Sequence, residues 1–144
     1  MPGRGPAAPV QSWSTGPVIL DPGPETVLVV DGANVVGSRP DGWWRDRAGA
    51  AARLHARLAT ASLSVDRVVL VLEGAARPGV PAGTLGALET VHAPGSGDDE
   101  VVAQVARATA TGGRVTVVTA DRGLRARVVA QGGQVVGPGW LAEQ

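Results

Sequence analysis

The chain has 144 residues, which is enough for one domain with a hydrophobic core. Its thirteen basic and thirteen acidic residues cancel, so no global field indicates a nucleic-acid partner, and a local patch would have to hold one. The absence of cysteine excludes a disulfide framework and a thiolate metal site. We expect no secretory signal and no membrane span, and therefore a cytoplasmic protein without a membrane partner.

The first part of the chain is rich in proline. Residues 1–24 contain six prolines among glycine, serine and alanine. Such spacing leaves no room for a helix and disfavours strands. We therefore expect a disordered tail over 1–24, followed by a single domain over 25–144.

Short apolar runs alternate with helical patterns through the rest of the chain. Consecutive apolar, β-branched residues predict buried parallel strands at 26–30, 67–72 and 114–119, and weaker strands at 88–92 and 134–136. Helical periodicity predicts helices over 45–59, 99–109 and 122–130. This alternation predicts an α/β fold, a three-layer sandwich around a mostly parallel five-stranded sheet.

Acidic residues follow the three strong strands, where parallel strands leave the sheet. Asp31 follows the first strand, Glu73 follows the second, and Asp121 comes shortly after the third. The acidic run 98–100 lies where a loop enters a helix at the same expected edge, which is where open parallel sheets bind ligands. Carboxylates that converge repel one another unless a cation lies between them, and oxygen ligands select hard ions. The pattern predicts a Mg²⁺ or Mn²⁺ site.

Each of these acids also has a structural interpretation. Asp31 can be a strand-to-turn residue, and Asp98, Asp99 or Asp121 can cap the amino terminus of the following helix. Glu73 precedes a glycine-rich segment over 73–83, which we interpret as a mobile loop near the rim that can act as a substrate flap. One metal site accounts for all the acids together, and we favour it over separate coincidences.

Three motifs resemble those of PIN-like nucleases, specifically the bacterial NYN branch of that superfamily. The first is DGANV over 31–35, the second is DEVVA over 99–103, and the third is VVTADR over 117–122. Their order and spacing agree with the family over residues 26–137. The resemblance implies a metal-dependent ribonuclease whose five strands, numbered along the chain, are ordered 3-2-1-4-5.

The resemblance also implies roles for particular residues. Asp31, Asp99 and Asp121 match the metal-binding acids of the family, and Asn34 matches a polar residue of its first motif; these four are the expected catalytic residues. Many members carry a further acid between the first and second motifs. The candidates for that acid here are Glu73, Glu89 and Asp98, of which we include Asp98 among the expected metal ligands.

Basic and aromatic residues supply candidates for substrate binding. RNA would be gripped by Arg122 and Arg125, together with Arg39, Arg45 or Arg47 on the first crossover. The pair Trp43 and Trp44 is unusual in a chain with four aromatic residues. Stacking of Trp43 on a base is one interpretation, and packing at a helix entry or a homodimer contact is the one we favour.

Three functions are consistent with this pattern. The first, which we favour, is an endoribonuclease that uses Mg²⁺ or Mn²⁺ to hydrolyse RNA phosphodiester bonds at the acidic rim. The second is a non-catalytic module of the same fold that binds RNA or a protein, which the ambiguous further acid allows. The third is a metal-dependent phosphohydrolase of nucleotides or other small molecules, which the neutral net charge favours slightly.

Overall fold

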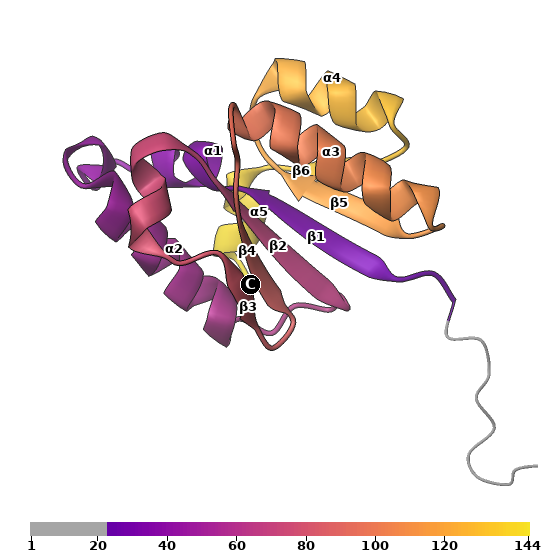
Figure 1. Cartoon of the computed structure of the whole chain (residues 1–144), viewed down its shortest axis with the longest axis horizontal. Coiled ribbons are helices and arrows are strands. Elements are labelled where there is room, and N and C mark those ends of the chain that lie inside the picture. Colours follow the sequence, from indigo (N-terminus) through magenta and orange to yellow (C-terminus); the bar gives the residue numbers. More distant parts are fainter. Residues whose placement is uncertain (1–22) are drawn as a thin grey trace, which may run out of the picture.

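Six strands form one sheet with helices on both faces (Figure 1), in a computed structural model that describes residues 23–144. The strands are β1 (Thr26–Asp31), β2 (Arg67–Leu72), β3 (Gly83–Leu85), β4 (Leu88–His92), β5 (Arg114–Val118) and β6 (Gln134–Val136). The helices are α1 (Gly32–Gly37), α2 (Arg47–Thr60), α3 (Gly97–Ala110), α4 (Arg122–Ala130) and α5 (Pro138–Ala142), with short 3-10 helices η1 (Trp43–Arg45) and η2 (Gly74–Gly79).

The sheet has the order β3-β4-β2-β1-β5-β6. Strands β4, β2, β1, β5 and β6 are parallel and follow the order 3-2-1-4-5, as the family resemblance implies. Strand β3 was not predicted; it pairs antiparallel with β4 at the edge of the sheet. All three of its residues are exposed, so no apolar pattern marks it in the sequence.

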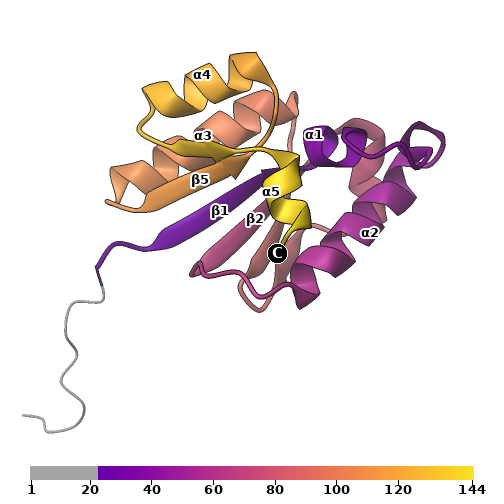
Figure 2. The ribbon, with the colours of Figure 1, turned by 180° about the vertical axis from the view of Figure 1, so that it is seen from behind.

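The central strand β1 is buried on both faces because its side chains alternate between two cores. Leu28 and Val30 pack into a core that includes Leu54 of α2. Val27 and Val29 pack into a second core that includes Val105 of α3. Figure 2, from behind, shows α2 on one side of the sheet and α3 and α4 on the other. The predicted three-layer α/β sandwich is confirmed. Consecutive residues of the strand are apolar because helices cover both faces of the sheet.

Helix boundaries follow capping side chains. Helix α2 begins two residues later than predicted because Asp46 caps it, accepting a hydrogen bond from the Gly49 amide at 2.8 Å. Helix α3 begins two residues earlier than predicted because Ser96 caps it, accepting from the Asp99 amide at 3.2 Å. Helix α4 has the predicted bounds. Helices α1 and α5 were not predicted, since each has fewer than seven residues and shows no full period.

The segment 73–83 differs from the predicted mobile loop. Residues 74–79 form η2, which packs closely against α2. The approach is so close that a Cβ atom at Gly79 would overlap the carbonyl oxygen of Ala48. This part of the rim is therefore a short helical element packed beside α2.

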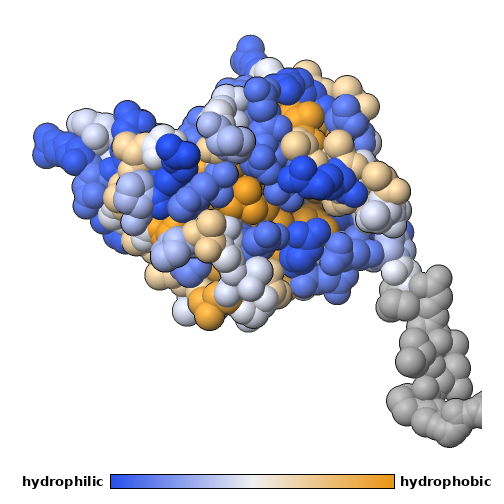
Figure 3. Space-filling model, in the orientation of Figure 1, coloured by the Kyte–Doolittle hydropathy of each residue, from blue (hydrophilic) through white to orange (hydrophobic). Residues whose placement is uncertain are grey.

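The predicted tail over 1–24 falls almost wholly on residues that lie outside the described ones, and strand β1 begins at Thr26. Within residues 23–144, no helix is both long and apolar enough to cross a membrane. The face shown in Figure 3 is mainly hydrophilic, with smaller hydrophobic areas between the polar ones.

Candidate functional site

The register of the central strands brings polar groups together at their carboxyl ends. Val30 of β1 pairs with Val118 of β5, so the next residues, Asp31 and Thr119, are neighbours. Asp31 itself pairs with Val71 of β2, which places Glu73 just beyond the same edge. The sheet thereby gathers side chains that lie more than forty residues apart in the chain.

Asp31 is buried, with 4% of its surface exposed. Its carboxylate accepts a hydrogen bond from the Thr119 hydroxyl at 3.0 Å and another from the backbone N–H of Asn34 at 3.4 Å. The bond from Asn34 makes Asp31 the amino-terminal cap of α1. One carboxylate oxygen thus has the structural role at the end of the strand that the sequence also allowed. Two hydrogen bonds, from β5 and from α1, therefore hold the Asp31 carboxylate in place.

Thr119 links two of the predicted acids, and the sequence analysis assigned it no role. Its hydroxyl donates to Asp31 and accepts from the Asp121 amide at 3.1 Å, and the residue is fully buried. The signal in the sequence is a hydroxyl residue directly after the apolar run of β5. Thr119 thereby fixes the orientation of Asp31 and the start of the turn that carries Asp121.

Asp121 caps the amino terminus of α4 by accepting from the Leu124 amide at 2.8 Å, as its structural interpretation expected. Asn34 holds the same turn from α1. Its side-chain oxygen accepts from the Ala120 amide at 2.8 Å. Because that oxygen is engaged, the group that Asn34 offers to a water or a phosphate is its NH₂.

Glu73 and Asp98 complete the acidic cluster. The Glu73 carboxylate accepts from the Gly97 amide at 2.8 Å and so ties the end of β2 to the start of α3. A Cβ atom at Gly97 would lie 2.9 Å from the other Glu73 oxygen, so a larger residue there would displace the Glu73 carboxylate. Asp98 follows in the first turn of α3 and is half-buried. Ser96 is the helix cap, so the expectation that Asp98 or Asp99 caps this helix is wrong.

The acids influence one another electrostatically. Burial raises the pKa of Asp31, the bonds from Thr119 and Asn34 lower it, and the charges of Asp98 and Glu73 raise it again. Burial also raises the pKa of Asp98, as do the charges of Asp121, Glu73 and Asp99, whereas the charge of Arg127 lowers it. Four carboxylates from β1, β2, α3 and the turn before α4 therefore form one group, which we call the acidic rim: Asp31, Glu73, Asp98 and Asp121.

Asp99 and Glu89 point to other partners. The carboxylate of Asp99 is 3.0 Å from the Arg127 guanidinium of α4 and has 74% of its side-chain surface exposed. Glu89 lies within β4, 3.5 Å from Arg67 near the amino end of β2. Neither is among the groups that raise the pKa of Asp31. Asp99 and Glu89 are thus engaged by arginines, whereas the charges of Asp98 and Glu73 act on Asp31.

The predicted substrate-binding residues are distributed around the rim. Arg122 is exposed at the first position of α4, next to Asp121. Arg125 donates to the Thr119 carbonyl at 3.2 Å and so supports the end of β5. The Arg45 guanidinium lies 5.7 Å from the ring centre of Trp44, on the exposed side of η1.

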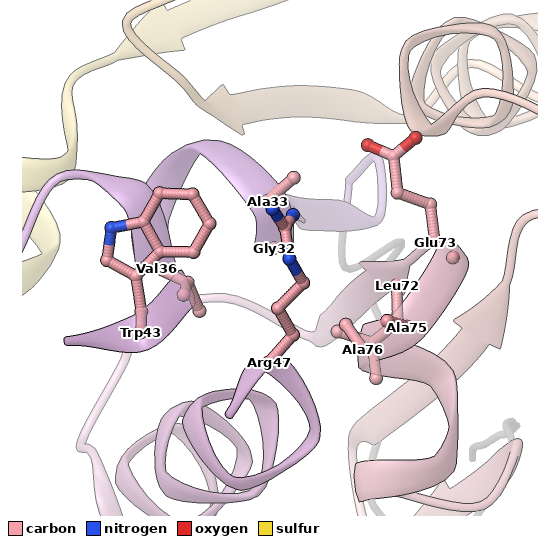
Figure 4. A pocket seen from close by; sticks show the side chains of 10 residues that line it. Gly32, Ala33, Val36, Trp43, Arg47, Leu72, Glu73, Ala75 and Ala76 are labelled. Carbon is pink, nitrogen blue, oxygen red and sulfur yellow. The ribbon is translucent and has the colours of Figure 1, made fainter. Parts of the chain in front are cut away.

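A pocket of about 510 Å³ adjoins the acidic rim between α1, α2 and the start of η2. Figure 4 shows Trp43 on one side of it, Glu73 on the other, and the Arg47 side chain extending between them toward Ala33. The remaining lining is mainly small or aliphatic: Gly32, Val36, Leu72, Gly74, Ala75 and Ala76.

The donor set of the acidic rim suits a hard cation. In residues 23–144, no three acidic or histidine side chains already stand together as a ligand set. Mg²⁺, however, is usually held by one or two carboxylates, with water and substrate phosphate as its other ligands. The buried Asp31 carboxylate, whose charge is opposed by Asp98 and Glu73, fits that mode of binding.

The comparisons with known proteins concern the fold. No protein-family model matches the sequence, and no curated protein matches it either. The structure is similar to the crystal structure of a mutant of Rae1 (YacP) from Bacillus subtilis, with a TM-score of 0.64. The sequence identity is 18%, and the match covers 82% of this chain and 73% of that chain. At this identity the similarity shows the fold alone.

Proposed function

We propose that the chain is a PIN-like, NYN-type endoribonuclease that uses Mg²⁺ or Mn²⁺ at the acidic rim. The observation that carries the proposal is the buried carboxylate of Asp31. It is hydrogen-bonded to Thr119 and repelled by the like charges of Asp98 and Glu73. Buried acids with raised pKa values at the carboxyl edge of a parallel sheet are typical of functional sites. The three sequence motifs and the similarity of the fold to Rae1 support the same family.

The residues of the acidic rim would have different roles in phosphodiester hydrolysis. Asp31 would be the central ligand of the cation, with Asp98 and Asp121 beside it, and Thr119 would hold Asp31 in its orientation. The NH₂ group of Asn34 would donate to the attacking water or to a phosphate oxygen without adding charge. When bound, the divalent cation would lower the pKa of the attacking water and stabilise charge on the leaving oxygen.

Arginines flank the rim and would offset the charge of an RNA backbone. Arg122 follows Asp121 directly in the chain. On the other side of α1, Arg39 and Arg57 line a second pocket of about 320 Å³ that also reaches Ala120. Burial and the charge of Arg39 lower the pKa of Arg57, which indicates that the two guanidinium groups lie near each other. Two neighbouring cations are a suitable contact for a phosphate.

The test is incubation of the purified chain with mixed single-stranded and structured RNA in Mg²⁺, Mn²⁺ or chelator. We expect internal cuts that require the cation. RNA that is retained but stays intact would instead identify a binding module of the same fold. Cleavage confined to nucleotides would identify a small-molecule phosphohydrolase.

A further inference from the structure

We propose that the pocket beside the acidic rim binds one unstacked nucleobase of a single-stranded RNA, held by Trp43 and Arg47. The inference rests on the proposed nuclease function and adds the place where a base next to the cut site is bound. It assigns a role to Arg47 and to the pocket as a unit.

The first argument is the stacking surface. The Arg47 guanidinium lies over the Trp43 ring, 4.9 Å from its centre, so the two groups form a cation–π contact. Aromatic rings and arginine guanidinium planes are the groups on which proteins stack unpaired RNA bases. The Arg47 side chain extends into the pocket (Figure 4), where its free N–H groups can also meet acceptors on a base edge.

The second argument is the position of the pocket. Gly32 and Glu73 belong both to its lining and to the segments that carry the acidic rim. Gly32 follows Asp31 directly and cannot carry a side chain, since a Cβ atom there would lie 2.5 Å from the Val71 carbonyl oxygen. The pocket therefore starts within one residue of the central acid. A base bound in it would belong to a nucleotide next to the phosphate at the rim.

The volume and the walls of the pocket determine which part of a nucleotide can enter it. The volume of about 510 Å³ is within the range of small-molecule sites. Its walls are mainly apolar, and the Glu73 carboxylate on one wall would repel a phosphate. A neutral, planar base suits walls of this kind, whereas the charged backbone suits the arginines around the rim.

A matched set of variants tests the pocket without relying on catalysis. The affinity of a labelled single-stranded oligoribonucleotide is measured by fluorescence anisotropy in chelator. Loss of one stacked base weakens binding about 5- to 100-fold, so Trp43→Ala and Arg47→Ala should each lose this much. Arg114→Ala removes an exposed arginine at the amino-terminal end of β5 and should bind within about twofold of the parent.

A second arm uses the unchanged protein, because Trp43→Ala can also disturb folding. Oligonucleotides that each lack one base are compared for binding to the parent chain. Removal of one particular base should lower the affinity of the parent about 5- to 100-fold. The same removal should lower the affinity of Trp43→Phe by a similar factor, because this variant keeps an aromatic ring.

The outcomes separate the pocket from the nuclease proposal. Equal affinity of all three alanine variants, or no sensitive abasic position, would overturn the pocket while leaving the nuclease proposal to the cleavage assay. Failure of the parent chain to bind the RNA would overturn the pocket as well. Weakened binding by the two pocket variants without any cleavage by the parent would support the pocket and contradict the nuclease.

Discussion

The Asp31 carboxylate is buried at the end of the central strand, where the charges of Asp98 and Glu73 oppose its own. The Thr119 hydroxyl and the Asn34 amide offset part of this unfavourable environment. The balance still raises the pKa of Asp31, so its ionised form destabilises the folded state when no cation is bound. A residue placed in this way is expected to serve binding at the expense of stability.

Replacement of Asp31 by Asn removes the buried charge and keeps the shape of the side chain. A folded-state pKa above that of the unfolded chain means that the folded chain holds the proton more tightly, so stability falls as the pH rises through that window. In chelator, we expect Asp31→Asn to be at least as stable as the parent at neutral pH. The difference should vanish below about pH 4, the ordinary pKa of aspartate, where both side chains are neutral.

Thermal melts of both proteins in chelator across this pH range measure the effect. If Asp31→Asn is the less stable protein at every pH, then Asp31 is a structural turn residue and not a ligand.

Asp98 and Asp99 are adjacent acids with different surroundings, and they form a matched pair. Asp98 lies with the acidic rim, whereas Asp99 forms an exposed ion pair with Arg127. Asp98→Asn should lower cation-dependent RNA cleavage about tenfold or more. Asp99→Asn should stay within about twofold of the parent and lose less than about 1 kcal/mol of stability, as is usual for an exposed pair. The cleavage rates of the two variants are measured at the same cation concentration. A larger loss of rate in Asp99→Asn than in Asp98→Asn would support Asp99, the acid that the motif indicated.

At the scale of elements, η2 forms one wall of the pocket, and glycine permits its packing on α2. A methyl group at Gly79 would overlap the backbone of Ala48, which cannot move without shifting α2. We expect Gly79→Ala to lower the free energy of unfolding by about 1–3 kcal/mol, the usual effect of overpacking. Denaturant unfolding measures it, with Gly95→Ala as the control, because a methyl group there meets no atom within 4 Å. Unchanged stability in Gly79→Ala would favour the mobile loop that the sequence predicted.

The sequence predicted the buried strands well because their apolar runs have no other stable place in a layered fold. It also predicted that Asp31, Glu73 and Asp121 reach one edge, since parallel strands align their ends. The motif assigned Asp99 as the matching acid, with Asp98 as a further ligand, because the contacts of the two residues depend on how α3 begins, which the motif does not show. Ser96 caps α3; Asp98 feels the charges of Asp121 and Glu73, whereas Asp99 forms an ion pair with Arg127.

Other elements depend on contacts that a sequence pattern does not show. Helix α1 follows β1 directly, although glycine at both of its ends and two adjacent valines disfavour a helix. The packing of buried Val35 and the cap from Asp31 outweigh that preference. The 3-10 helix η2 likewise forms where its glycines allow close contact with α2, although glycine and proline in sequence indicate a loop.

At the scale of the whole molecule, cation binding couples to folding. A ligand that binds only the folded state stabilises it by about 2.7 kcal/mol at 100 times its dissociation constant. We therefore expect saturating Mn²⁺ to raise the melting temperature of the parent chain and to leave that of Asp31→Asn nearly unchanged. Melting curves with and without the cation measure the shift, and an equal shift in both proteins would place the cation elsewhere.

We propose that the acidic rim around Asp31 cuts RNA. The most direct measurement is the rate of internal RNA cleavage by the parent chain and by Asp31→Asn, purified in the same way and supplied with the same Mn²⁺. We predict cuts by the parent that stop in chelator, and a rate at least about 100-fold lower for Asp31→Asn, as expected when a group that stabilises the transition state is lost. Equal cleavage by the two proteins would contradict the account, since the activity would then come from another site or from a contaminating nuclease.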